Sequence, residues 1–214
     1  MHNLYYRWKK LNYDILIPPM HPPFAEMTGE EAQQYFEWFV AQIPNRIHYL
    51  AQYSKIKLDY SDTSLIAIWK WFIKHAKTET TPTKRMCEIR RQVQFQYPSD
   101  MFNAVMRMRS RQFSLETEYI LRDVAMYFGE YWVQKHPQLH WGIINTDPEL
   151  TNFHMPCIHG FVDCSFDPPY MVDFEPIHMV HVCASKLLEG QAKPDDLYDD
   201  LYNLYITWKR MVNE

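Results

Sequence analysis

The sequence predicts an α+β protein that is mainly helical, with about six helices and a small antiparallel sheet or hairpin in its C-terminal half. Three observations predict this class. Apolar residues recur with the 3.6-residue period of helices, capping residues and prolines mark helix ends, and two later segments change to the period of strands. The 214 residues suit a single domain, with a helical part at about 25–112 and a helix–hairpin–helix–helix part at about 113–214.

The first helix is predicted to begin at the segment TGEE. Thr28 as N-cap and Glu31 three residues later have the spacing of a capping box. Pro44 is expected to interrupt or kink this helix, because proline lacks the N–H that a helix interior needs, and a second helical stretch is expected at 45–54. The segment SDTSLIAIWKWFIKHA predicts another helix, capped by Asp62 or a neighbour.

The middle of the chain is basic. KTETTPTK predicts a loop, and helices are expected around 85–95 and 99–109. Ser114 is then placed to cap a long helix that ends before Pro137. Gly129 falls inside this helix, where glycine costs about 1 kcal/mol relative to alanine, so a strand or helix packed closely on that point is expected.

The C-terminal half changes period. LHWGII and FHMPCIHGFV predict two strands of an antiparallel hairpin joined by NTDPELTN, and DCSFDPPYMVDF predicts a proline-rich turn region. Pro176 fits the first position of a helix that stops at Gly190. Pro194 is expected to start the last helix, with Asp195 and Asp196 in its first turn, where carboxylates complement the helix dipole.

Composition narrows the class of protein. Aromatic residues make up 16% of the chain, which suits a dense core or a partner surface, and five glycines argue against phosphate-binding loops. The N-terminus has no apolar run typical of a signal peptide, and no stretch reaches the roughly 18 apolar residues of a membrane span. Four cysteines without disulfide-type spacing predict reduced thiols and a cytoplasmic location.

Charge is distributed unevenly along the chain. The segment 84–111 holds seven basic and two acidic residues, a net charge of +5, which leaves −9 for the remainder of a chain whose net charge is −4. Such a dipolar pattern steers association with charged partners. The segment VMRMRSRQF, with Arg107, Arg109 and Arg111, is also compatible with phosphate contacts, although the acidity of the whole chain argues against a nucleic-acid partner.

Histidines and cysteines gather in two clusters that raise the question of a metal site. The metal-ligand candidates are His154, Cys157, His159, His178 and His181. Neither cluster has the paired spacing of a closed zinc site. Strand alternation puts Cys157 and His159 on one face with Phe161 and sends His154 to the other, while the helical wheel turns His178 and His181 away from the core. We therefore expect no metal and no other cofactor.

Catalytic motifs are absent from the sequence. GxSxG, Walker A, GxGxxG and HExxH do not occur, and Ser114 and Ser165 lie in no nucleophile motif. The helix glutamates Glu116, Glu118 and Glu130 are typical of a solvated face, and Cys87 lies among arginines that favour a thiolate without any other sign of chemistry. The sequence thus favours a binding protein over an enzyme.

The run YFGEYWVQKHPQLHWGI…PCIHGFVD, at 127–163, resembles a pattern in small bacterial proteins of polymorphic-toxin neighbourhoods, where a helix carrying GE leads to a Trp-bearing strand and a second strand. Many such proteins are presumed immunity proteins. The resemblance implies a cytosolic, non-catalytic protein that neutralises a cognate toxin by binding it. It supplies no catalytic residue and covers only the C-terminal half of the chain.

On this hypothesis an acidic cluster near the C-terminus is the candidate contact for a basic toxin surface. The candidate partner-binding residues are Asp195, Asp196, Tyr198, Asp199, Asp200 and Tyr202. Two alternatives remain open. One is a small metal-dependent hydrolase that uses the His/Cys-rich region 154–183, and the other is a nucleic-acid-associated factor that uses the basic segment 84–111.

Overall fold

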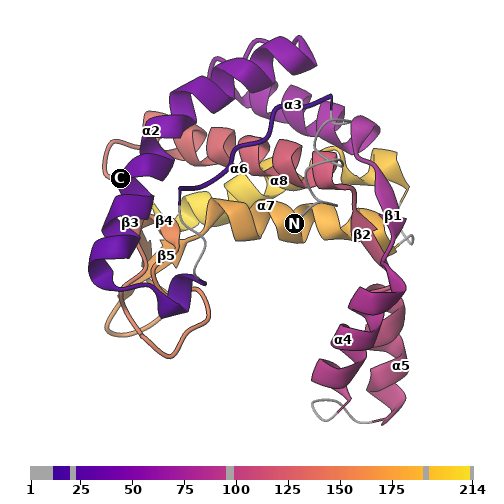
Figure 1. Ribbon diagram of the computed structural model, residues 1–214. Helices are drawn as coiled ribbons and strands as arrows, with labels where there is room; N and C mark the ends of the chain where they lie inside the picture. The colour runs from indigo at the N-terminus through magenta and orange to yellow at the C-terminus, as the bar shows by residue number, and fades with distance from the viewer. Residues whose placement is uncertain (1–11, 20–22, 95–98, 190–192, 213–214) are drawn as a thin grey trace.

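A central helix, α6, organises the computed structural model, which describes residues 12–19, 23–94, 99–189 and 193–212 (Figure 1). Helices α2 and α3 lie on one side of α6, and α7 and α8 lie on the other. A three-stranded sheet flanks one end, and a two-stranded ribbon carrying two further helices leaves the other end. The elements are η1 Phe24–Glu26, α2 Gly29–Ser54, α3 Asp62–His75, β1 Thr78–Thr80, α4 Thr83–Val93, α5 Ser99–Met108, β2 Arg111–Phe113, α6 Leu115–Lys135, β3 His140–Ile143, β4 Pro156–Asp163, β5 Tyr170–Phe174, α7 Pro176–Glu189, η2 Pro194–Leu197, α8 Asp200–Trp208 and η3 Lys209–Met211.

The predicted class is confirmed: the fold is α+β and mainly helical, with small antiparallel sheets. The capping box is also confirmed, because the Thr28 hydroxyl accepts from the backbone N–H of Glu31 and the Glu31 carboxylate accepts from that of Thr28. The break expected at Pro44 is wrong. Helix α2 runs through Pro44 without an interruption, and Ile43 and Ile47 on either side of the proline are both buried in the core.

The ribbon at the far end of α6 was missed by the sequence analysis. The loop predicted for KTETTPTK contains strand β1, and β1 pairs antiparallel with β2 over Thr78↔Phe113, Glu79↔Gln112 and Thr80↔Arg111. Three-residue strands are too short to show an alternating pattern. The two helices predicted between them are confirmed as α4 and α5.

Helix α6 begins where predicted, because the Ser114 hydroxyl accepts from the backbone N–H of Thr117. The close neighbour predicted at Gly129 is also present. A Cβ at this position would lie 2.3 Å from Cζ2 of Trp141 on β3 and 3.2 Å from Cγ of Pro176 at the start of α7. The glycine therefore lets a strand and a helix approach α6 at one point.

The hairpin of β3 and β4 is confirmed, with His140 opposite His159 and Gly142 opposite Cys157. The turn predicted for DCSFDPPYMVDF is partly wrong, because its last five residues form β5, which pairs with β4. Gly160, at φ 106°, lies where the β4–β5 register shifts. The bulge reverses the alternation, so the predicted grouping of Phe161 with Cys157 and His159 is wrong, and Phe161 packs in the core against Phe174.

The end of the chain differs from the prediction of one helix starting at Pro194. Residues Pro194–Leu197 form the short 3₁₀ helix η2, and α8 begins only at Asp200. The reason is Leu197, which is 3% exposed and whose carbonyl accepts the Trp69 indole N–H at 2.8 Å, so this turn is tied to α3. Helix α7 starts at Pro176 as predicted, whereas its predicted stop, Gly190, lies outside the described residues.

A buried ion pair joins the two longest helices. Arg46 of α2 and Asp123 of α6 are 5% and 1% exposed, and the guanidinium donates from Nη2 at 2.7 Å and from Nε at 3.0 Å to the carboxylate. The hydroxyl of Tyr13, from the segment before η1, donates to the same carboxylate. Burial raises the pKa of Asp123, and the pairing with Arg46 opposes that rise. Three segments distant in sequence thus share one carboxylate.

Replacing Asp123 with Asn is expected to lower the free energy of unfolding by about 3–5 kcal/mol, because the buried Arg46 then keeps only the exposed carboxylate of Asp14, at 3.4 Å, as an ion-pair partner. Denaturant unfolding measures the loss, and Asp147→Asn, on an exposed loop, is the matched control. The double variant Arg46→Met/Asp123→Leu should recover much of it, since no unpaired charge remains. An Asp123→Asn protein as stable as the wild type would contradict this account.

Gly129→Ala is expected to destabilise the fold by about 1–3 kcal/mol, although alanine is the better helix former, because the new methyl group overlaps the Trp141 indole. That indole cannot move away freely, since its N–H donates to Glu130 at 2.8 Å. Gly29→Ala is the control, because nothing lies within 4 Å of a Cβ there. Thermal unfolding should separate the two variants, and a rise in stability for Gly129→Ala would contradict the overlap.

Candidate functional site

Helices α4 and α5 form a hairpin that projects away from the rest of the molecule, which we call the arm (Figure 1). Their main tertiary contacts are with each other. The β1–β2 ribbon joins the arm to α6, and at the base of the arm the hydroxyl of Thr81 donates to the carbonyl of Arg109 at 2.8 Å. The arm is thus a small helical unit carried on a ribbon.

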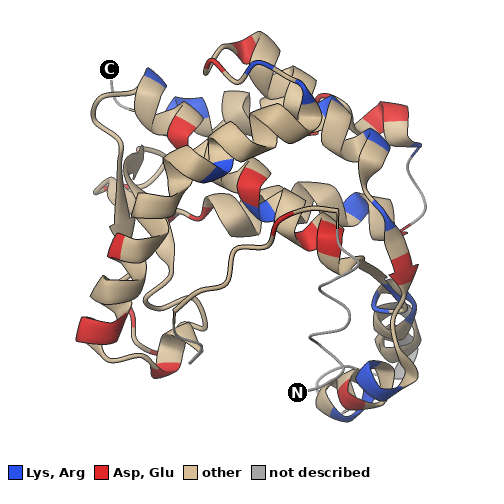
Figure 2. Ribbon diagram, turned by 45° about the horizontal axis from the view of Figure 1, so that its top comes forward, with Lys and Arg blue, Asp and Glu red and all other residues tan. Residues whose placement is uncertain are grey.

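The surface of the arm is basic and partly apolar. Figure 2 shows lysine and arginine along its helices, and Lys84, Arg85, Arg91 and Arg107 are all exposed. The seam between the helices is thin, with Val93 as the one buried residue of α4. Two methionines face solvent among these charges: Met101 is 50% exposed and Met108 is 56% exposed. The arm therefore offers positive charge and flexible apolar side chains together.

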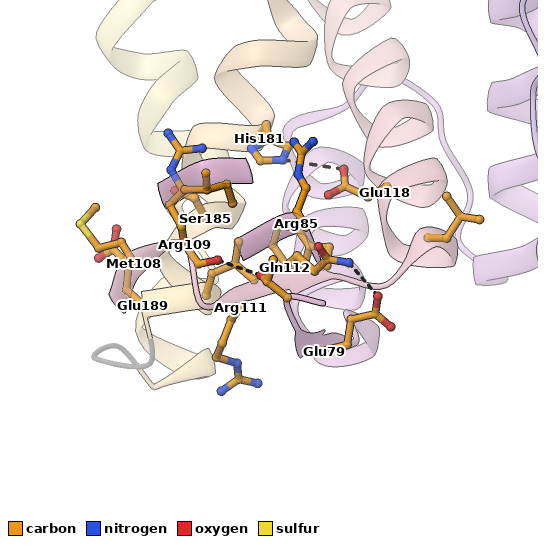
Figure 3. A pocket seen from close by; sticks show the side chains of 15 residues that line it. Glu79, Arg85, Met108, Arg109, Arg111, Gln112, Glu118, His181, Ser185 and Glu189 are labelled. Carbon is orange, nitrogen blue, oxygen red and sulfur yellow. Dashed lines mark hydrogen bonds and ion pairs between the residues drawn. The ribbon is translucent and has the colours of Figure 1, made fainter. Parts of the chain in front are cut away.

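A pocket of about 570 Å³ lies at the foot of the arm, where it meets α6 and α7 (Figure 3). This volume is in the range of small-ligand sites. Figure 3 shows Arg85 extending toward His181 and Glu118, whereas Arg111 points away from them. The lining residues are Glu79, Thr81, Arg85, Ile89, Met108, Arg109, Arg111, Gln112, Phe113, Leu115, Glu118, His181, Ser185, Leu188 and Glu189.

The charges in this pocket are only partly paired. Glu118 lies 3.7 Å from Nε2 of His181, and Glu79 accepts from the amide of Gln112 at 2.8 Å. By contrast, the guanidinium groups of Arg85 and Arg109 make no ion pair with any carboxylate in the part of the chain that the structure describes. The pocket therefore offers two cations to a ligand.

His181 is the one histidine among the residues that line the pocket. Its hydrogen bond to Glu118 raises its pKa above the ordinary value of 6.5, and partial burial and the nearby Arg109 oppose this rise without cancelling it. The Ser185 hydroxyl one turn along α7 donates to the carbonyl of Val182 at 2.7 Å. This serine is thus engaged with the backbone and is not held by His181 as a nucleophile would be. The arrangement suits binding of an anionic group.

The predicted acidic cluster lies on another part of the surface, at η2 and the start of α8, and lysine side chains pair with two of its four aspartates. Asp200 pairs with Lys186 at 2.7 Å, and Asp199 lies 3.8 Å from Lys70. The same Lys70 stands over the ring of Tyr198. Tyr202 donates to Asp62, Asp196 accepts from the backbone N–H of Lys193, and Asp195 and Asp196 are exposed.

The five predicted metal-ligand candidates lie in different parts of the structure. Cys157 and His159 lie together on β4, and Asp173 of β5 joins them. Among the described residues this is the one group of three or more donor residues, so His154, His178 and His181 are not part of such a cluster. Asp173 was missed because its strand was predicted as a turn region. Burial raises the pKa of the Cys157 thiol, so it is a poor nucleophile.

The remaining catalytic candidates do not form a site. Glu116 pairs with Lys77 at 3.2 Å, Glu118 with His181, and Glu130 accepts from Trp141, so the three glutamates of α6 serve separate neighbours. Cys87 is exposed on the arm, and all four cysteines are free thiols.

Comparison with known proteins found no family model, no curated protein and no solved structure that matches this chain. Within the described residues, no helix combines the length and the apolar character needed to cross a membrane.

The imidazole of His181 is expected to titrate above pH 6.5, and Glu118→Gln should lower its midpoint. Because the folded-state pKa is raised, the stabilisation from this pair is present below about pH 6.5 and is lost as pH rises through the folded value. NMR titration of the ring resonances tests this. His136 is the internal reference, since burial lowers its pKa, and a His181 midpoint below that of His136 would contradict the pairing.

Proposed function

We propose that this protein is a non-catalytic binding protein of the immunity type, which neutralises a cognate toxin protein in the cytoplasm by binding it. We further propose that the arm and the pocket at its foot are the binding surface. The observation that carries the proposal is the basic arm itself, a hairpin of exposed arginine and methionine side chains held away from the core on a ribbon. The four free thiols are compatible with a reducing compartment.

The exposure of the arm supports a role in recognition because it has little role in the core. Val93 is the one buried residue of α4, and no residue of either arm helix belongs to the main core cluster of the described residues. A hairpin that buries so little gains little stability from its own packing. Arg85 and Arg109, which have no carboxylate partner among the described residues, gain most from a partner surface that supplies carboxylates.

The chemistry of the arm favours an acidic protein surface over nucleic acid. Arginine and methionine are both enriched at protein–protein interfaces. A nucleic acid carries phosphates along its whole length and would also meet the remainder of the chain, whose net charge is −9. Inside the pocket, Glu79, Glu118 and Glu189 would repel a continuous row of phosphates. A protein partner can place carboxylates beside Arg85 and Arg109 without bringing negative charge close to the glutamates.

The arm replaces the acidic cluster as the leading contact surface. Asp199 and Asp200 already have lysine partners, so a basic toxin surface would have to displace Lys70 and Lys186. The unpaired arginines of the pocket need no such exchange. Charge attraction between the arm and an acidic partner surface would also speed association at low ionic strength.

The proposal predicts that the double variant Arg85→Glu/Arg109→Glu binds the partner at least about tenfold more weakly, since two attractions become repulsions. The partner to be tested is the protein encoded by the neighbouring gene, co-expressed and co-purified with the full chain, and affinity is measured by calorimetry at low and high salt. The matched control is Lys209→Glu/Arg210→Glu, an equal change in net charge at exposed residues of η3.

Equal loss of affinity in both double variants would mean that net charge, rather than the arm, matters. Unchanged affinity in the arm variant would contradict the assigned surface. A salt-sensitive gel shift of a short RNA or DNA oligonucleotide, lost in the arm variant while no neighbouring protein binds, would replace the proposal with the nucleic-acid alternative.

A further inference from the structure

A second, smaller pocket adjoins the pocket at the foot of the arm. It has a volume of about 200 Å³, and Leu115, Glu118 and His181 line both pockets. The ion pair of Glu118 with His181, at 3.7 Å, therefore lies where the two pockets meet. The side chains of this pair are 42% and 46% exposed. The two pockets thus form one groove, with a polar midpoint that is open to solvent.

The groove follows α6 and α7 where these two helices pack against each other. On α7 its lining includes Ile177, His181 and Ser185, which are spaced by four residues and therefore share one face of the helix. Ile177 belongs to the smaller pocket, Ser185 to the larger one, and His181 to both. At a rise of about 1.5 Å per residue, the two outer positions are about 12 Å apart along the helix axis. This length separates the two ends of the groove.

The two ends of the groove differ in chemistry. The end toward the arm holds the guanidinium groups of Arg85 and Arg109, which make no ion pair with any carboxylate of the described residues. The other end is lined by Leu121 of α6 and Ile177 of α7, with the aromatic ring of Tyr119 beside them. One end therefore attracts a negative charge and the other accepts apolar carbon.

The smaller pocket has room for one large apolar side chain. A cavity of roughly 150 Å³ holds a benzene ring, and this pocket has about 200 Å³. Its one basic side chain, Arg122, stands with the guanidinium carbon 5.6 Å from the centroid of the Tyr119 ring. A planar guanidinium beside an aromatic ring can itself pack against a further ring. The pocket therefore suits a phenylalanine or leucine side chain.

An extended peptide segment fits this arrangement better than a helix. Helices dock in grooves that are apolar along their length, whereas the midpoint here is the pair of Glu118 and His181. These two exposed side chains can hydrogen-bond the N–H and C=O groups that an extended backbone leaves free.

The length of the groove sets the spacing of the two side chains that fill its ends. An extended chain advances about 3.3 Å per residue and its side chains alternate between two faces. Side chains four residues apart therefore share a face and lie about 13 Å apart, close to the length of about 12 Å measured along α7. Side chains three residues apart point to opposite faces, so only one of them can enter the groove.

We propose that the groove binds an extended segment of the partner protein in which an acidic side chain and a large apolar side chain are four residues apart. The acidic side chain pairs with Arg85 and Arg109, and the apolar side chain enters the smaller pocket. A single acidic side chain suffices, because Glu79 and Glu189 line the same end of the groove and repel a second one. The inference rests on the proposed function for the existence of a protein partner, and adds the kind of segment that the partner presents.

Fluorescence anisotropy of labelled peptides with the full chain tests the groove. The probe is a capped peptide of alanine and serine that carries one aspartate and one phenylalanine four residues apart, made in both orders. The better order should bind at least about tenfold more tightly than a peptide of the same composition with the two side chains three residues apart, because only the first spacing fills both ends. Replacing the aspartate with lysine should abolish binding, since Arg85 and Arg109 then repel the peptide.

Variants of the protein test the two ends separately. Arg109→Glu should weaken binding of the probe at least about tenfold, whereas Arg210→Glu, an equal change of charge on η3, should not. Tyr119→Ala removes one wall of the smaller pocket and should weaken binding about fivefold or more. Its control is Tyr170→Ala, at a ring that is 49% exposed on β5. The comparison of spacings uses the unaltered chain, so it decides the question even where a variant does not fold.

Equal affinity for the two spacings, no binding of either order, or equal effects of Tyr119→Ala and Tyr170→Ala would each overturn the inference. These outcomes are distinct from failure of the proposed function, because the peptides are tested without the partner. If the neighbouring protein binds through the arm and the peptides do not bind, the groove inference alone fails. If the peptides bind with the stated spacing and the neighbouring protein does not, the immunity role fails and the groove remains a peptide site.

Discussion

The buried pair of Arg46 and Asp123 is the constraint on which the arrangement of the helices depends. A carboxylate in the interior of α6 must find a counter-ion, because desolvating it alone costs more than packing can return. Among the described residues Arg46 of α2 supplies this counter-ion, and the N-terminal segment adds the hydroxyl of Tyr13. The ion pair thus favours the register of α2 against α6 in which Arg46 and Asp123 meet. The positions of everything attached to α6 follow from that register.

The pocket at the foot of the arm and the three-stranded sheet lie at opposite ends of helix α6. Near its start, Ser114 and Glu118 meet the β1–β2 ribbon and the pocket, and near its end Gly129 receives the indole of Trp141 from the sheet. The middle of the helix is occupied by the ion pair and by fully buried rings. The pocket at the foot of the arm and the three-stranded sheet are therefore separated by a packed core.

Helix starts, which depend on interactions within one turn, were predicted from the sequence. Elements that depend on contacts between distant segments were missed. Thr28, Ser114 and Pro176 mark helix starts because capping and the fixed φ of proline act within one turn. The strands β1, β2 and β5 form only because each pairs with a strand elsewhere in the chain. Helix α2 likewise continues through Pro44 where its neighbours are packed in the core. The site shows the same division: the arginines of 84–111 were visible as a charge pattern, but Glu118 and His181 join Arg85 only in space. Likewise Asp173 reaches His159 through the strand pairing.

The β1–β2 ribbon at the base of the arm affects how the sequence of the arm can change. Thr80 and Arg111 face each other across the ladder, so the thirty residues between them leave and re-enter the body at neighbouring points. Such a segment behaves as an insertion in a hairpin loop, whose length and composition change at little cost to the body. Mutation can therefore exchange the proposed recognition surface while the core stays constant. A single scaffold could in this way follow a partner whose surface is itself changing.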